Sequence, residues 1–320
     1  MNFNNDVSKK ILKKRDIKPS SLKAYLLNLQ KIMKLMDLTP SVENLDKALN
    51  NFSKTMEVLK DKKPSTIRNY LASIVVYLSL DEKNNEIVAK YREQMDKFQK
   101  ENNEQIANNQ KTDSQKKNWA TMDELKNVLK KYKKELDLKG SLKKEELSKK
   151  EFDLLQKWVV GNLYIGDKSN PPLRNDYSMN IISEMEYNKL SEEDKKKINY
   201  LVVKNKSNKY FSLGEYKTSD KFGIKIIKVG PKLNKVLNIW LKYNKSKYLI
   251  LNSKGEKISP NSLTKLLIKT FEPTGKKISS SMIRHIFITE RFPPQTKEKQ
   301  ELANDMLHSK QMQTEVYSKA

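Results

Sequence analysis

The chain has 320 residues, and at roughly 150 residues per domain this length predicts two domains. Lysine and arginine number 64 against 39 acidic residues, which leaves a net charge of +25. The absence of cysteine excludes disulfides, thiolate zinc sites and cysteine nucleophiles. No apolar run approaches the roughly 18 residues that span a bilayer, and the first residues lack the apolar stretch of a signal peptide. We therefore expect an intracellular, strongly basic protein with no membrane partner.

Residues 1–100 have the apolar spacing of amphipathic helices. Proline–serine pairs begin the first predicted helix at Pro19 and the third at Pro64, because proline suits the first turn of a helix. The second predicted helix begins at Thr39-Pro40 and extends to Leu59, and the fourth begins near Asn85. Four short helices predict a small helical bundle.

The segment 101–118 is polar and contains only two apolar residues, Ile106 and Ala107. We interpret it as a linker between the two domains, the alternative being the frayed end of the fourth helix. Thr121 and Glu124 then form a capping-box pattern that begins a new helix. The second domain is therefore predicted at 119–320.

Three short strands separated by polar turns follow within the second domain, because the apolar period changes after residue 199. The expected fold class is mainly α with a small antiparallel β-sheet, that is, α+β. The predicted strands are 201–203, 209–213 and 224–229, and the flanking helices lie at 152–163, from 231, from 260, at 280–292 and at 300–307.

The excess of positive charge favours a polyanionic partner, for which nucleic acid is the obvious candidate. The alternative is codon bias in an AT-rich genome, since lysine numbers 58 and arginine only six. Where lysine is so common, each arginine is a candidate for bidentate phosphate binding, which lysine performs poorly. The six are Arg15, Arg68, Arg92, Arg174, Arg284 and Arg291.

Both histidines and two of these arginines occur in or beside a few short motifs of the second domain. The motifs are PPLRNDY with Arg174, EYKTSDKFG with Lys217, SSSMIRHIF with Ser281, Arg284 and His285, and LHSKQMQTEVY with His308 and Tyr317. In this order they resemble the tyrosine recombinase (phage-integrase) family, which carries an arginine, a hairpin lysine, a His-x-x-Arg box, a histidine or tryptophan, and a tyrosine nucleophile. Within that family, the compact PPLRNDY form resembles the integrases of eukaryotic DNA viruses, virophages and related mobile elements.

The resemblance implies a helical, SAM-like core-binding domain at 1–100 that binds DNA, followed by a tyrosine-recombinase catalytic domain. It implies that Tyr317 attacks a phosphodiester of double-stranded DNA and forms a 3′-phosphotyrosyl link. Arg174 and Arg284 would hold the non-bridging oxygens, Lys217 would protonate the leaving 5′ oxygen, and His308 would donate a hydrogen bond to the phosphate. This chemistry needs no cofactor, no metal and no ATP.

Ser281 departs from the family pattern, because most members carry histidine or lysine at this position. Either Tyr317 loses its proton to water or to the phosphate, or Ser281 only donates a hydrogen bond, or the chain is slow or inactive. Ser281 could instead cap the helix that carries Arg284, a role open to Ser279 and Ser280 as well. His285 is expected to be structural, packed beneath Arg284.

The function expected from this resemblance is site-specific recombination that integrates or resolves a viral or mobile genome, by protomers that assemble as a tetramer on DNA. A viral source would place the protein in the host nucleus or in a cytoplasmic viral factory. One alternative is relaxation of DNA by a monomer of the type IB topoisomerase kind. Another is a DNA-binding protein that keeps the fold without the chemistry, an alternative that the serine at position 281 favours. For Arg174 and Arg284 themselves, the alternative to phosphate binding is ion pairing with acids such as Asp176 or Glu290.

Overall fold

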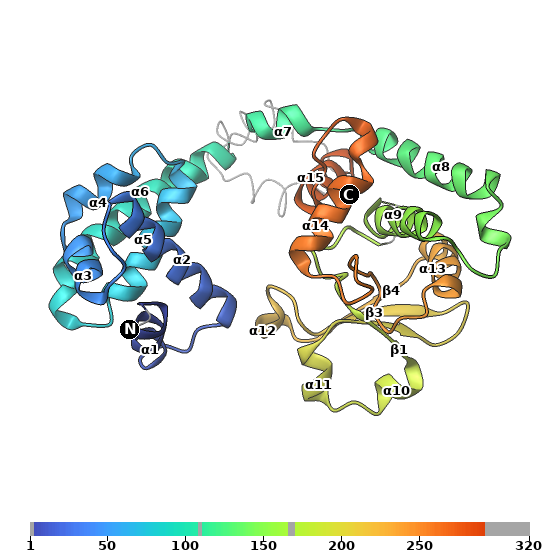
Figure 1. The fold of residues 1–320 in the computed structure, drawn as a ribbon, viewed down its shortest axis with the longest axis horizontal. Helices are drawn as coiled ribbons and strands as arrows, with labels where there is room; N and C mark the ends of the chain where they lie inside the picture. The colour runs from blue at the N-terminus through green and yellow to red at the C-terminus, as the bar shows by residue number, and fades with distance from the viewer. Residues whose placement is uncertain (1–2, 108–110, 166–169, 292–320) are drawn as a thin grey trace, which may run out of the picture. The chain divides into compact units, whose positions relative to one another are not determined.

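The structure is a computed structural model that describes residues 3–107, 111–165 and 170–291. The chain divides into two compact units, Met1–Gln110 and Lys111–Ala320, which are called here the N-terminal and C-terminal units. The protein is mainly helical with one small sheet, so the α+β fold class is confirmed (Figure 1). Within the described ranges, no helix is long and apolar enough to cross a membrane.

The N-terminal unit contains six α-helices in its described part, two more than the sequence predicts. They are α1 (Phe3–Leu12), α2 (Pro19–Leu35), α3 (Val42–Asn50), α4 (Phe52–Leu59), α5 (Pro64–Leu78) and α6 (Asn85–Ala107). The prediction of one continuous helix from Thr39-Pro40 to Leu59 is wrong, because Asn51 divides this segment into α3 and α4. The Asn51 side chain caps α4 by accepting a hydrogen bond from the Lys54 backbone N–H. Ser41, not Thr39, caps α3.

Helix α5 lies in the core of this unit, with Leu71 and Ile74 fully buried. A polar network ties α1 to it. The Tyr77 hydroxyl donates to Asp46 Oδ1 at 2.8 Å and accepts from the Lys10 ammonium at 3.2 Å. The Arg15 guanidinium donates to Ser79 Oγ at 2.7 Å, so this rare arginine has a structural contact within the unit.

Much of the segment 101–118 is helical rather than an open linker. Helix α6 continues to Ala107, and α7 occupies Asp113–Asn118. A capping box between Thr112 and Gln115 begins α7, because each side chain bonds to the other residue's backbone N–H. Polar residues such as Glu, Gln and Lys are good helix formers, so low apolarity alone does not break a helix. The division between the units, after Gln110, lies inside this segment.

The C-terminal unit is built around helix α9 (Lys149–Ile165), whose residues Leu155, Val159 and Leu163 are fully buried. Four helices pack against α9: α8 (Met122–Leu138), α13 (Pro231–Tyr243), α14 (Pro260–Thr270) and α15 (Ser280–Arg291). The capping box predicted at the start of α8 is confirmed, with the Thr121 backbone N–H donating to the Glu124 carboxylate at 2.7 Å. The predicted helix at 300–307 lies outside the described residues.

The sheet has four strands in the order β1-β2-β3-β4, and they are β1 (Asn180–Ser183), β2 (Tyr200–Val203), β3 (Lys209–Leu213) and β4 (Lys225–Lys228). The three predicted strands are confirmed as β2, β3 and β4, which pair antiparallel. Strand β1 was not predicted and pairs parallel to β2, so the sheet is mixed rather than antiparallel. The crossover between them contains two short helices, α10 (Glu184–Asn188) and α11 (Glu192–Lys197).

A buried lysine joins this sheet to helix α13. Lys209 on β3 is 3% exposed, and burial lowers the pKa of its ammonium group. The ammonium donates to Asn234 Oδ1 at 2.8 Å, to Asn238 Oδ1 at 2.6 Å and to the Lys206 carbonyl at 2.9 Å. These bonds hold the β2–β3 turn against α13, which places Asn208 and Asn234 at one end of the pocket described next.

Candidate active site

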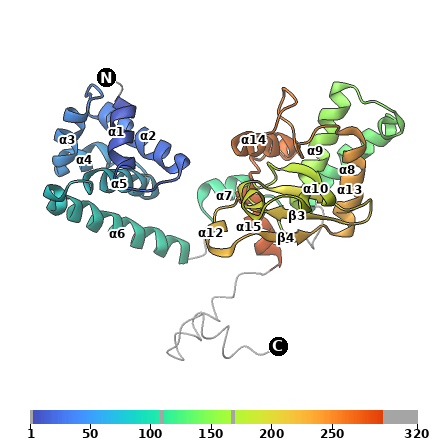
Figure 2. The ribbon, with the colours of Figure 1, turned by 90° about the horizontal axis from the view of Figure 1, so that it is seen from below.

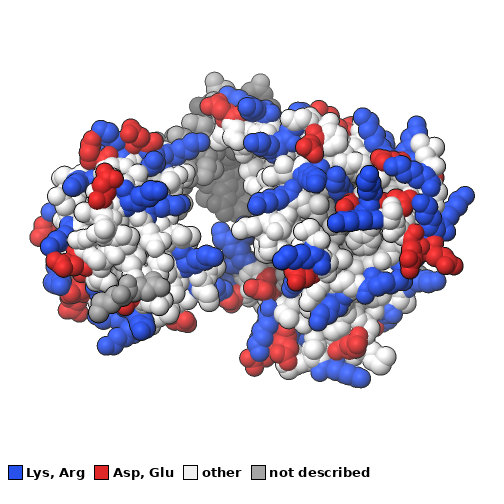
Figure 3. Space-filling view, viewed as in Figure 1, with Lys and Arg blue, Asp and Glu red and all other residues white. Residues whose placement is uncertain are grey.

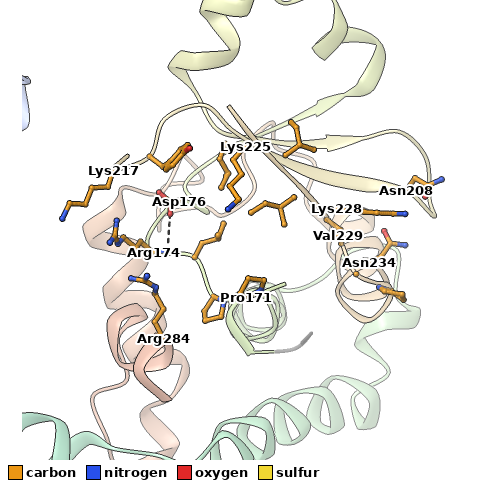
Figure 4. Close-up of a pocket in the computed structure, with 18 of the residues that line it drawn as sticks. Pro171, Arg174, Asp176, Asn208, Lys217, Lys225, Lys228, Val229, Asn234 and Arg284 are labelled. Atoms are coloured by element: carbon orange, nitrogen blue, oxygen red, sulfur yellow. Dashed lines mark hydrogen bonds between the residues drawn. The ribbon is translucent and has the colours of Figure 1, made fainter. Parts of the chain in front are cut away.

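The C-terminal unit contains an open pocket of about 1160 Å³ between the sheet, the loop after α9, and helices α13 and α15 (Figure 4). Its lining combines apolar residues, Pro172 and Ile227 among them, with polar and basic ones. Figure 3 shows lysine and arginine side chains scattered over the visible face of this unit, among uncharged and acidic ones. The described lining of the pocket is itself basic, because it holds one acidic residue, Asp176, and six basic ones: Arg174, Lys217, Lys225, Lys228, Lys235 and Arg284.

Three of the residues predicted from the motifs meet at this pocket. Arg174 comes from the loop after α9, Lys217 from the β3–β4 connection and Arg284 from α15. Figure 4 shows the two guanidinium groups at the same side of the pocket, next to the Asp176 carboxylate. Residues from three distant parts of the chain thus form one cationic cluster.

Hydrogen bonds from Tyr164, within the loop itself and through Asn175 hold the loop that carries Arg174. The buried Tyr164 hydroxyl donates to the Arg174 carbonyl at 2.6 Å, and the Arg174 N–H donates to Asp176 Oδ2 at 3.2 Å. Asn175 donates from Nδ2 to Thr264 Oγ1 at 3.0 Å, and its Oδ1 accepts from Ser280 Oγ at 3.0 Å. Asn175 therefore ties the Arg174 loop to α14 and to the helix that carries Arg284.

Helix α15 presents Arg284 from its first two turns. Met282, Ile283 and Ile286 are buried, and this face fixes the rotation of the helix and leaves Arg284 half-buried at the pocket. Ser279 Oγ accepts from the Met282 N–H at 3.2 Å, so Ser279 is the serine that caps α15.

The exposure of two residues of this helix bears on the roles expected for them. Ser281 is exposed and is not among the described residues that line the pocket. Of the three serines considered as the helix cap, Ser279 takes that role, while a part for Ser281 in the chemistry stays a prediction. His285 is also exposed rather than packed beneath Arg284. The helical period explains both results, because positions 281 and 285 share a face opposite to the buried positions 282, 283 and 286.

Lys217 lies in the connection between the antiparallel strands β3 and β4, as the hairpin position in the motif implies. It is exposed, and in Figure 4 its side chain extends away from the centre of the pocket, whereas Lys225 on β4 points into the pocket. Lys225 was not singled out as a site residue. Its signal in the sequence was only its nearness to Lys217, and the fold of the hairpin brings both lysines to the same pocket.

Arg174 and Arg284 have one acidic neighbour in the described lining of the pocket, Asp176. Burial raises the pKa of the Asp176 carboxyl, while its hydrogen bond from the Arg174 backbone and the positive charges of Arg174 and Arg284 oppose that rise. Among the described residues, neither guanidinium forms an ion pair. Glu290 instead accepts from the Met122 backbone N–H at 2.7 Å. Two arginines are therefore available to an anionic ligand.

His308 and Tyr317 lie outside the described residues, so their predicted roles remain predictions. Within the described ranges, no group of three histidine, aspartate or glutamate side chains is placed to hold a metal ion. The lining of the pocket also includes Lys228, Lys235 and Asn234, which were not predicted as site residues.

Comparisons with known proteins give little further identification. No protein-family model matches the chain, and no curated protein matches it. Among solved structures, the chain resembles the crystal structure of XerA recombinase with 9% sequence identity and a TM-score of 0.32, over 99% of this chain and 93% of that one. This is a distant likeness in fold, and it assigns neither a family nor an activity.

Proposed function

We propose that the protein is a site-specific DNA recombinase that cuts and rejoins duplex DNA through a 3′-phosphotyrosyl intermediate on Tyr317. The observation that carries this proposal is the meeting of Arg174 and Arg284 at one pocket without an ion-pair partner among the described residues. Two planar guanidinium groups can bind the non-bridging oxygens of one phosphodiester with paired hydrogen bonds. Lysines beside them add a proton donor for a leaving oxygen.

The proposed roles follow from these positions. Arg174 and Arg284 stabilise the charge that builds on the phosphorus as Tyr317 attacks. A lysine protonates the leaving 5′ oxygen, and Lys217 is the residue that the motif order favours. Asp176 places a carboxyl group beside the two guanidinium groups and orients the Arg174 loop by accepting a hydrogen bond from the Arg174 backbone N–H. His308 adds a hydrogen bond to the phosphate.

The order of the sequence motifs supports a biological setting for this reaction. The reaction would integrate or resolve a viral or mobile genome, with protomers assembled as a tetramer on DNA. The enzyme would act inside the cell, in the nucleus or cytoplasm of a host if its source is viral.

A second candidate is a DNA-binding protein that retains the fold but cuts slowly or not at all. It is favoured by Ser281, which is neutral, exposed and absent from the pocket lining at the position where the related motif carries a base. Both candidates predict binding to duplex DNA. They differ in whether a covalent protein–DNA adduct forms.

The test is incubation with a pool of nicked duplexes, followed by a denaturing gel that detects protein covalently bound to DNA. The recombinase proposal predicts an adduct that persists in EDTA and disappears in Tyr317→Phe, while the affinity of that variant for DNA is retained. Lys217→Ala and Lys225→Ala, compared with each other, identify the proton donor by the larger loss of cleavage rate. DNA binding without an adduct from any nicked duplex would favour the second candidate, and an adduct formed equally by Tyr317→Phe would refute the assignment of the nucleophile.

A further inference from the structure

A buried asparagine at the end of the β1–β2 crossover connects two parts of the pocket. Asn199 lies immediately before β2 and is 6% exposed. Its Nδ2 donates to the Glu215 carbonyl at 2.8 Å and to the Asp176 carbonyl at 3.4 Å, and its Oδ1 accepts from the Glu215 N–H at 2.8 Å. The side chain therefore bridges the backbone of the loop that carries Arg174 and the backbone of the β3–β4 connection, residues 214–224.

The crossover that ends at Asn199 is itself firmly packed. Its apolar residues lie against β2 and β3 on the face of the sheet away from α13 (Figures 1 and 2). Gly214, at the start of the β3–β4 connection, lies so close to α11 that a Cβ there would be 1.9 Å from the Lys195 carbonyl oxygen. The start of the connection is therefore held by backbone contact at Gly214 and by the Asn199 amide at Glu215.

Two lysines of the pocket depend on the position of this backbone. Lys217 follows Glu215 by two residues, and Lys225 lies across the same hairpin on β4. The Tyr216 hydroxyl donates to the Gly223 carbonyl at 2.9 Å, which closes the connection between the two lysines. A shift of the backbone at Glu215 would therefore move the lysines relative to the two arginines of the pocket.

We propose that Asn199 is a positioning residue that holds the proton-donating lysine of the β3–β4 hairpin at a fixed distance from a phosphate bound by Arg174 and Arg284. This inference rests on the proposed function. In that reaction the Tyr317 oxygen bonds to phosphorus, and the bond from phosphorus to the 5′ oxygen breaks. The 5′ oxygen keeps the electron pair and takes a proton from the lysine ammonium, while the proton of Tyr317 passes to water or to the phosphate. Proton transfer requires a donor within hydrogen-bond reach, so a displaced hairpin slows the departure of the 5′ oxygen.

The first test compares two nicked duplexes that differ in one atom at the scissile phosphate, both built on a sequence that forms an adduct with the wild type. One carries the ordinary 5′ oxygen, and the other carries a bridging 5′ sulfur. Sulfur leaves as a thiolate without a proton from the enzyme, because the pKa of a thiol is only about 8.5. In Asn199→Ala, single-turnover adduct formation should fall about 100-fold on the oxygen duplex and return close to the wild-type rate on the sulfur duplex.

Two other variants calibrate this comparison. The variant that lacks the proton donor, identified from Lys217→Ala and Lys225→Ala, should be restored by sulfur in the same way. Arg284→Lys should stay slow on both duplexes, because it weakens the stabilisation of charge on the phosphate rather than the proton transfer. A loss in Asn199→Ala that sulfur does not restore, or no loss on the oxygen duplex, would overturn the inference.

Asn244→Ala is the matched control, because the Asn244 amide forms the same set of backbone hydrogen bonds away from the pocket lining. Its Nδ2 donates to the Tyr248 carbonyl at 2.9 Å and to the Leu249 carbonyl at 3.4 Å, and its Oδ1 accepts from the Ser246 N–H at 3.0 Å. This variant should react like the wild type on both duplexes. A loss confined to the oxygen duplex in Asn244→Ala, equal to that in Asn199→Ala, would overturn the inference.

The second test needs no cleavage. Hydrogen exchange of the protein without DNA should be about tenfold faster in Asn199→Ala, both at the Glu215 amide and in the Arg174 loop, because each loses a hydrogen bond to the bridge. Asn244→Ala should leave both segments unchanged, and unchanged exchange at Glu215 in Asn199→Ala would overturn the bridge. If Asn199→Ala melts below the assay temperature, Asn199→Asp takes its place in the cleavage assay. It keeps the acceptor for the Glu215 N–H, loses both donated bonds, and should show the same loss confined to the oxygen duplex.

The two proposals fail in different ways. Adducts formed by the wild type, together with a loss in Asn199→Ala that sulfur does not restore, would leave the recombinase standing without the positioning role. Faster exchange in both segments of Asn199→Ala, without an adduct from any duplex, would refute the recombinase and with it the catalytic purpose of the bridge.

Discussion

Asn175→Ala should uncouple the Arg174 loop from the helix that carries Arg284. The substitution removes the hydrogen bond to Thr264 and the hydrogen bond from Ser280, both 3.0 Å long. Each such bond contributes about 0.5–1.5 kcal/mol net, so the loss should be about 2 kcal/mol. For a unit of this size that corresponds to a fall of about 4–8 °C in Tm.

The rate of adduct formation should fall much further than stability, by about 100-fold, because small misplacements of positioned groups carry penalties of that order. Asn175 acts here as a positioning residue, since its side chain holds the loop and lies beside the arginine that binds the phosphate. Scanning calorimetry gives Tm, and single-turnover adduct formation on a nicked duplex, well below Tm, gives the rate. Ser280→Ala and Thr264→Val, which each remove one of the two bonds, should show intermediate losses of rate.

The matched control is Asn244→Ala in the same unit. Asn244 is 4% exposed, donates to the Tyr248 carbonyl at 2.9 Å and does not line the pocket. It should lose comparable stability and keep the cleavage rate. Equal rates in Asn175→Ala and Asn244→Ala would refute the reasoning, because the loss would then come from general destabilisation.

Two further substitutions probe the support and the charge of the site. Gly214→Ala would place its Cβ 1.9 Å from the Lys195 carbonyl oxygen, so this overpacking should lower the free energy of unfolding by about 3 kcal/mol or more and lower Tm. In Gly140→Ala the new Cβ meets nothing within 4 Å, so this variant should lose only the stability that its positive φ costs an alanine. Equal melting temperatures of the two variants would contradict this. Asp176→Asn should raise Tm at neutral pH, because burial raises the pKa of the Asp176 carboxyl above the unfolded value of 3.8 and stability is lost as pH rises through that window. Thermal melts at a series of pH values should show that the higher Tm of Asp176→Asn, relative to the parent, disappears at low pH. A difference in Tm that grows on acidification would show that the pKa of Asp176 is lowered rather than raised.

Elements specified by neighbouring residues could be predicted from the sequence. The capping box of Thr121 and Glu124, and the proline-led starts at Pro19 and Pro64, mark helix beginnings that the structure confirms. Strands β2 to β4 were likewise predicted, because short apolar runs between polar turns identify antiparallel hairpins. These signals are local, since a cap or a tight turn depends on residues within a few positions of each other.

The motif order also predicted Arg174, Lys217 and Arg284 as site residues, but their meeting at one pocket is a property of the fold. No sequence pattern near position 180 predicted β1. Its four residues form a strand because they pair with β2, which follows after a crossover. The tertiary structure likewise decided that Lys225 enters the pocket while Ser281 remains outside its lining. Packing among distant segments sets which face of a helix or hairpin is buried, and the spacing of residues within one motif does not contain that information.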